Sequence, residues 1–74
     1  MTNDSEQGFS ILLNGESYSI NRDPSLLSLI EGLNLRRGRI AIELNQSVIP
    51  KAEWANVSLR PGDIVEIVNF VGGG

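Results

Sequence analysis

Apolar and polar residues alternate along three segments of the chain, a period typical of β-strands that bury one face. These segments are residues 9–13, 39–45 and 64–71. Asn14 and Gly15 follow the first segment, and because both residue types tolerate a positive φ, they predict a tight hairpin turn. The short apolar segment at residues 18–20 is then expected to form the second strand of that hairpin.

A helix is predicted between the hairpin and the middle strand, because four apolar residues recur there at the spacing of one helical face. They are Leu26, Leu29, Ile30 and Leu33. Asp23 belongs to the residue types that cap helices, and Pro24 after it suits the first helical position, where its missing N–H is not needed. Asn34 can end the helix in the left-handed conformation.

Three smaller elements fill the rest of the chain. Residues 47–49 predict a short extended piece, and residues 50–55 predict a single helical turn that carries Trp54. We expect this tryptophan to cover the edge of the core. Pro61 and Gly62 suit a type II turn before the last strand.

The order of these elements is a hairpin, a helix, a strand, small elements and a final strand. The helix must bury its apolar stripe on one face of the sheet, and the final strand can fill the middle of the sheet. This order predicts an α+β chain with the ubiquitin-like β-grasp fold, a mixed sheet of four to five strands packed on one central helix. We expect a flexible N-terminal arm at residues 1–8, the domain at residues 9–71 and a flexible reactive tail at residues 72–74.

The alternation in the last strand also predicts an outward face of the sheet. If Val65 and Ile67 face the helix, then Glu66 and the residues two and four positions after it point the other way. Scattered apolar residues on a surface are common, but convergence on the strand that leads into the tail indicates a docking surface. The predicted partner-binding residues, rimmed by Glu43 and Glu66, are Leu12, Ala41, Val68, Phe70 and Val71.

The composition argues against an enzyme that works alone. The 74 residues include no cysteine and no histidine, so disulfides and thiolate metal sites are excluded, and the commonest metal ligand and general base are missing. The carboxylates are spread along the chain without the spacing of an acid–base pair or a metal cage. We therefore expect a carrier or binding protein that holds no metal and no cofactor of its own.

The charge distribution limits the classes of partner that the chain is expected to bind. A net charge of −3 is mild, and a nucleic-acid interface would need a clustered basic face; the short group Arg36, Arg37 and Arg39 is typical of a solvated loop. The first eight residues lack the features of a secretory signal, and no apolar run is long enough for a membrane span. We expect a cytoplasmic protein that is a monomer when free and binds neither nucleic acid nor membrane.

The chain ends in Val71-Gly72-Gly73-Gly74 directly after the predicted last strand. Glycine has no Cβ, so such a tail can thread into a closed site where a bulky side chain would clash. The terminal carboxylate of Gly74 is a group that an activating enzyme could turn into an acyl phosphate anhydride. Terminal glycines alone are also typical of a disordered end or a linker, but their position after a β-grasp pattern favours a reactive tail.

Three runs carry a family resemblance. The sequences RIAIELN at residues 39–45, VIPKAEW at 48–54 and LRPGDIVEIVNFVGGG at 59–74 closely resemble the thiamine-biosynthesis sulfur-carrier proteins of the ThiS family. Residues 13–33 also fit the first hairpin and helix of that family. The resemblance covers nearly the whole domain, and the Pro-x-x-x-Trp spacing and the glycine-ended run are specific in combination.

The resemblance implies a mechanism and a set of partners. An E1-like adenylating enzyme (ThiF-like) would activate the Gly74 carboxylate with ATP, which that partner enzyme uses. A sulfur donor, such as a persulfide on a cysteine desulfurase, would convert it to a thiocarboxylate, and thiazole synthase (ThiG-like) would take the sulfur. Gly73 and Gly72 would form the side-chain-free segment that precedes the reactive end.

Other classes of function remain open on the residues alone. The same chemistry could serve molybdopterin synthesis, although the tail of those carriers usually follows a Pro-Pro-type segment, whereas Asn69-Phe70-Val71 precedes the glycines here. A ubiquitin-like protein modifier joined to lysines would use a similar tail. A plain β-grasp binding module would not use the tail at all, because one fold hosts many roles.

Overall fold

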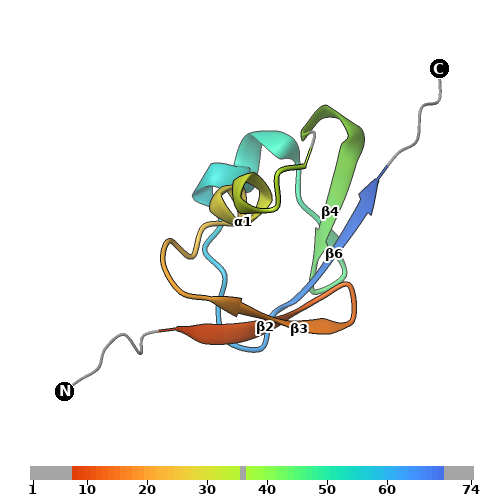
Figure 1. Cartoon of the computed structure of the whole chain (residues 1–74). Helices are drawn as coiled ribbons and strands as arrows, with labels where there is room; N and C mark the ends of the chain where they lie inside the picture. Colours follow the sequence, from red (N-terminus) through yellow and green to blue (C-terminus); the bar gives the residue numbers. More distant parts are fainter. Residues whose placement is uncertain (1–7, 36, 70–74) are drawn as a thin grey trace.

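A mixed five-stranded sheet forms the framework of the computed structural model, which describes residues 8–35 and 37–69 (Figure 1). Its strands are β2 (Phe9–Leu13), β3 (Glu16–Ile20), β4 (Ile40–Leu44), β5 (Ser47–Val48) and β6 (Ile64–Asn69). Their order across the sheet is β3-β2-β6-β4-β5, so the last strand is central. β6 runs parallel to β2 and antiparallel to β4. The β-grasp prediction, with the final strand in the middle, is confirmed.

The hairpin of β2 and β3 turns where the sequence predicts. Asn14 and Gly15 both have positive φ, 49° and 86°, and the strands pair in register from Leu13 opposite Glu16 to Phe9 opposite Ile20. The second strand is longer than predicted, because the serines that alternate with its apolar residues continue the pairing to the turn.

The α-helix, α1 (Leu26–Gly32), begins later than predicted. Ser25 is the N-cap, and its hydroxyl accepts the N–H of Ser28 at 3.0 Å. The prediction that Asp23 caps the helix with Pro24 at the first helical position is therefore wrong. Ser25 lies three residues before the free N–H of Ser28, the spacing that capping requires, while the Asp23 carboxylate accepts the N–H of Ser25 at 3.0 Å. That hydrogen bond, together with one from the Ser28 side chain, lowers the pKa of Asp23.

The helix covers one face of the sheet together with two short 3₁₀ helices, η1 (Arg37–Arg39) and η2 (Lys51–Asn56) (Figure 1). The exit at Asn34 has a φ of 61°, as predicted. Trp54 on η2 is only 2% exposed, and its Nε1 donates to the carbonyl of Ile49 at 2.9 Å. Trp54 therefore lies within the core, whereas the sequence predicted that it covers the core's edge. Its burial is possible because the Ile49 carbonyl, in the segment before η2, accepts the hydrogen bond of its only polar atom.

The core lies between the helix and the inner face of the sheet. Its buried members are Ile11, Ile20, Leu26, Leu29, Ile30, Ile40, Ile42, Trp54, Leu59 and Val65. Three of the four residues of the predicted helical stripe are in this set, and the fourth, Leu33, is half-buried against it. Each fully buried aliphatic side chain contributes roughly 1.5–3 kcal/mol relative to exposure, so this cluster holds the sheet and the helix together.

Candidate functional site

The strand that leads toward the C-terminus is held on its β2 side partly by a side chain. β2 pairs with β6 at Leu12–Ile64 and Leu13–Val65, and the chain then turns away at Asn14. The Asn14 side chain continues the ladder: its Oδ1 accepts the N–H of Ile67 at 2.8 Å, and its Nδ2 lies 3.4 Å from the Ile67 carbonyl. The side-chain amide of Asn14 thus forms the hydrogen bonds to Ile67 that the backbone of a further β2 residue would otherwise form.

A second asparagine holds the other end of β6 from the β4 side. Asn45 has a φ of 51°, and its Oδ1 accepts the N–H of Ile64 at 2.9 Å. Its Nδ2 donates to Asp63 at 3.1 Å, and the same carboxyl group accepts the N–H of Arg60 at 2.8 Å. Together the two asparagines fix the position and direction of β6 as far as its last described residue, Asn69.

The outward face of the sheet carries the described part of the predicted partner-binding set. Leu12 is 41% exposed and Val68 is 51% exposed, and Ala41 lies half-buried directly opposite Val68 on the neighbouring strand. The remaining predicted residues, Phe70, Val71, Gly72, Gly73 and Gly74, lie outside the described residues. The structure therefore brings the three described positions to one face, centred on β6.

Two further apolar residues on this face were not in the predicted set. Ile64 is 44% exposed and lies opposite Leu12; the alternation along β6 already placed it on the same side as Glu66 and Val68. Val48 is 65% exposed and lies opposite Glu43. Its position depends on the register of the short β5, which no sequence pattern specified.

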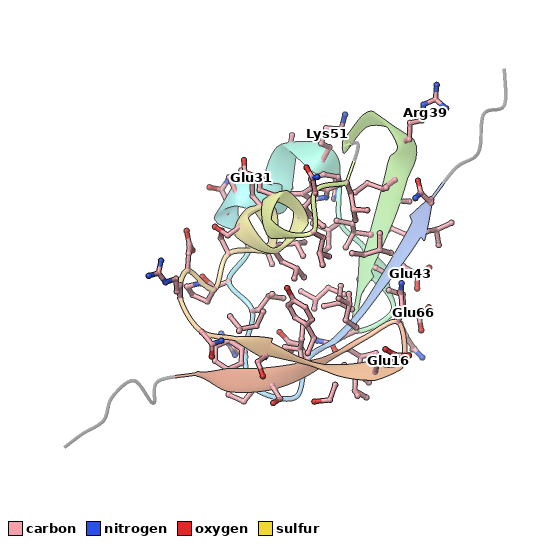
Figure 2. The ribbon with its side chains drawn as sticks, in the orientation of Figure 1. Glu16, Glu31, Arg39, Glu43, Lys51 and Glu66 are labelled. Atoms are coloured by element: carbon pink, nitrogen blue, oxygen red, sulfur yellow. The ribbon has the colours of Figure 1, made fainter. Side chains whose placement is uncertain are left out.

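Glu43 and Glu66 lie directly opposite each other on β4 and β6, on the face away from the helix (Figure 2). Neither forms an ion pair within residues 8–35 and 37–69. They border a shallow hollow of about 410 Å³ that Asn45, Gln46 and Ile64 also line. Like charges on opposite positions of two strands repel each other modestly, and a cation from outside would relieve that repulsion. We name this surface the outer face; it consists of Leu12, Ala41, Glu43, Val48, Ile64, Glu66 and Val68.

Other kinds of site find no support in the described part of the chain. It contains no group of three or more residues placed to hold a metal ion. It also contains no helix long and apolar enough to cross a membrane.

The fold and this surface define a ubiquitin-like β-grasp protein whose central strand leads to a glycine tail. A solved structure of the thiamine biosynthesis protein (ThiS) from Geobacter metallireducens has the same fold, with a TM-score of 0.76 and 23% identity over 89% of this chain and 100% of that one. The ThiS family model matches residues 11–74. The chain belongs to the ThiS family, which confirms the resemblance found in the sequence.

Two curated relatives illustrate the range of the family. The sulfur carrier protein ThiS of Bacillus subtilis is 33% identical over 63 residues, covering 84% of this chain and 96% of that protein. A thiazole synthase of Paramagnetospirillum magneticum is 33% identical over 64 residues, covering 86% of this chain. The match spans only 20% of the length of that synthase, so a ThiS-like region accounts for about a fifth of the larger protein.

Proposed function

We propose that this chain is the sulfur carrier of thiazole synthesis in the thiamine pathway, and that the terminal carboxylate of Gly74 carries the sulfur. The observation that supports this most directly is the extent of the family match, which runs through Gly74 and so includes the whole glycine tail. The ThiS match favours this pathway over molybdopterin synthesis. In this proposal the chain is a co-substrate of its partner enzymes and performs no catalysis itself.

The proposed chemistry has three steps. A carboxylate oxygen of Gly74 attacks the α-phosphorus of ATP on the partner adenylyltransferase, and pyrophosphate leaves. The terminal sulfur of a donor persulfide, such as one on a cysteine desulfurase, then attacks the acyl carbon, and AMP leaves. A thiol reductant cleaves the resulting S–S bond, which frees the thiocarboxylate. The absence of side chains at Gly72 and Gly73 lets this segment enter a site that closes to exclude water.

The outer face is the proposed docking surface for the adenylyltransferase. It lies on β6, the strand that directly precedes the tail, so a partner bound there is within reach of Gly74. Its exposed Leu12, Ile64 and Val68 supply apolar contact area, and contiguous exposed apolar groups usually mark a partner site. The facing Glu43 and Glu66 favour a partner that offers a cationic side chain.

Thiazole synthase is the proposed acceptor of the sulfur. Support comes from the relatives: proteins named thiazole synthase contain a region similar to this chain over about a fifth of their length. A carrier region in the same polypeptide as the synthase keeps the two at high effective concentration. We infer that the separate chain delivers its thiocarboxylate to a synthase of the same type.

The docking proposal is tested by placing a charge on the outer face. Val68→Asp puts a carboxylate among the apolar groups, and burying it against a partner should raise the KM for this chain in adenylyltransferase-catalysed ATP–pyrophosphate exchange by at least about tenfold, a change of about 1.4 kcal/mol. The matched control is Ala52→Asp, because Ala52 is exposed on η2, on the helix side of the sheet. Equal KM values for the two variants would contradict the assignment of the outer face.

A further inference from the structure

The outer edge of β3 has backbone groups without hydrogen-bond partners among residues 8–35 and 37–69. On β2, the N–H of Leu12 donates to the backbone carbonyl of Asp63, and the carbonyl of Ser10 accepts the N–H of Gly62. The backbone groups of the even-numbered residues of β2 therefore point toward β6. The odd-numbered residues, such as Ile11 opposite Tyr18, therefore bond toward β3. Along β3 the intervening Ser17 and Ser19 must point their N–H and carbonyl groups away from the sheet.

This edge lacks most of the features that prevent one strand from pairing with another. Natural edge strands are usually protected by proline, by lysine or by a bulge. β3 reads ESYSI, with a single charge at Glu16 beside the turn, and it pairs with β2 without a bulge. The serines are small and exposed, so an extended segment can approach their backbone closely.

A groove runs beside this edge, between β3 and α1, with a volume of about 330 Å³. Tyr18 and Ile20 line it from the strand and Leu29 from the helix. Gly32 completes the helix side, and a Cβ at that position would meet nothing within 4 Å. The groove thus has apolar side chains on both its strand and its helix side, and it is open at Gly32, where a side chain from another chain would enter.

The groove also offers a cation with which an acidic group of a ligand could pair. Arg22 lines it beyond the end of β3 and has no ion pair among the described residues. Asp23 also lines the groove, but its carboxylate already accepts the N–H of Ser25. A carboxylate on a bound segment could therefore form an ion pair with the guanidinium of Arg22.

We propose that β3 and this groove bind an extended peptide segment of another protein by β-strand addition. The segment pairs with the backbone of Ser17 and Ser19, places an apolar side chain against Leu29 and Gly32, and directs an acidic residue to Arg22. Strand addition of this kind takes its affinity from main-chain hydrogen bonds and its specificity from pockets for alternate side chains. The groove lies on the helix side of the sheet and the outer face on the other side, so the inference does not depend on the proposed function.

Two other occupants fit the groove less well. Residues 1–7 read MTNDSEQ and offer one apolar side chain, at the far end from the domain. A second copy would pair its own β3, whose apolar residues Tyr18 and Ile20 already line its own groove. The arm therefore lacks further apolar groups, and a second copy, although its Glu16 is acidic, has its apolar groups already engaged in its own groove.

The test is an NMR titration of the full ¹⁵N-labelled chain with a synthetic peptide of about ten residues. The peptide alternates isoleucine and threonine and ends in two aspartates; a control peptide carries proline at its centre, which removes a backbone donor. We expect saturable shifts at the amides of Ser17, Ser19 and Gly32 with the first peptide and none with the second. Replacing the aspartates by lysines should weaken binding several-fold.

Gly32→Leu provides the decisive variant, because a Cβ there meets nothing within 4 Å, the longer side chain would occupy the groove, and leucine is a better helix former than glycine. We expect at least an about tenfold loss of affinity for the peptide, whereas Ala52→Leu, which adds apolar bulk on η2, should leave affinity unchanged. Unchanged affinity in Gly32→Leu would overturn the proposal.

Three further results would also overturn it. One is the absence of saturable shifts at Ser17 and Ser19 up to about 2 mM peptide, a concentration that detects even millimolar affinity. Another is a shift of these amides with protein concentration alone, which would make a second copy the occupant. The third is a shift of the same amides on deletion of residues 2–7, which would assign the groove to the chain's own arm.

Discussion

The role of Asn14 in holding β6 can be isolated by a single substitution. Asn14→Gly removes the side-chain amide but accepts the φ of 49° without strain. The variant therefore loses the 2.8 Å hydrogen bond from the Ile67 N–H and the weaker 3.4 Å contact with the Ile67 carbonyl, while the backbone turn remains available.

The expected cost follows from these two contacts. A hydrogen bond contributes about 0.5–1.5 kcal/mol to stability, and the contact at 3.4 Å adds little. Glycine also raises the conformational entropy of the unfolded chain, at a cost of about 0.5–1 kcal/mol. The second contribution is measured by a control, Asn34→Gly, because Asn34 has a φ of 61° and its side chain forms no hydrogen bond within the described residues.

We expect Asn14→Gly to be less stable than Asn34→Gly by about 1 kcal/mol, which corresponds to about 4–8 °C in Tm for a domain of this size. Urea unfolding followed by the fluorescence of Trp54, the only tryptophan, measures this difference in free energy of unfolding. Equal free energies of unfolding for the two variants would show that the side-chain amide of Asn14 does not stabilise β6.

Two other predictions concern stability. Trp54→Phe removes the donor to the half-buried Ile49 carbonyl and should destabilise the fold by about 1–3 kcal/mol, measured by circular dichroism during urea unfolding; a loss below about 0.5 kcal/mol would contradict a stabilising role for that hydrogen bond. Because its hydrogen bonds lower the pKa of Asp23 from 3.8, the stability it contributes is present above the unfolded pKa and is lost as the pH falls through the folded value. Asp23→Asn should therefore flatten the fall in Tm at acidic pH, and an unchanged profile of Tm against pH would contradict this.

Much of the fold could be predicted because local patterns and tertiary packing agree. The Asn14-Gly15 turn, the stripe of Leu26, Leu29 and Ile30, and the turn at Gly62, whose φ is 83°, each appear where the residues indicate. The helix start could not be predicted from residue types, because Asp23 and Ser25 are both good caps. The choice depends on which oxygen reaches the N–H of Ser28.

The outer face was predicted only in part, because local alternation reveals which face a residue lies on but not how distant strands pair. Alternation along one strand assigns faces, so Leu12 and Val68 were found, and Ile64 could have been found by the same rule. Val48 could not, because its place opposite Glu43 depends on the pairing of a two-residue strand. The bracing of β6 by Asn14 and Asn45 joins residues far apart in sequence, so no local pattern could reveal it.

The proposed function rests on the transport of sulfur by the terminal carboxylate of Gly74. Its most direct test is the intact mass of the full chain after incubation with ATP, an active ThiF-like adenylyltransferase, a persulfide donor and a thiol reductant. We expect a gain equal to the exchange of one oxygen for one sulfur, and no gain for a chain that lacks Gly74. An unchanged mass with an enzyme shown to be active on a known carrier, or an equal gain in the truncated chain, would contradict it.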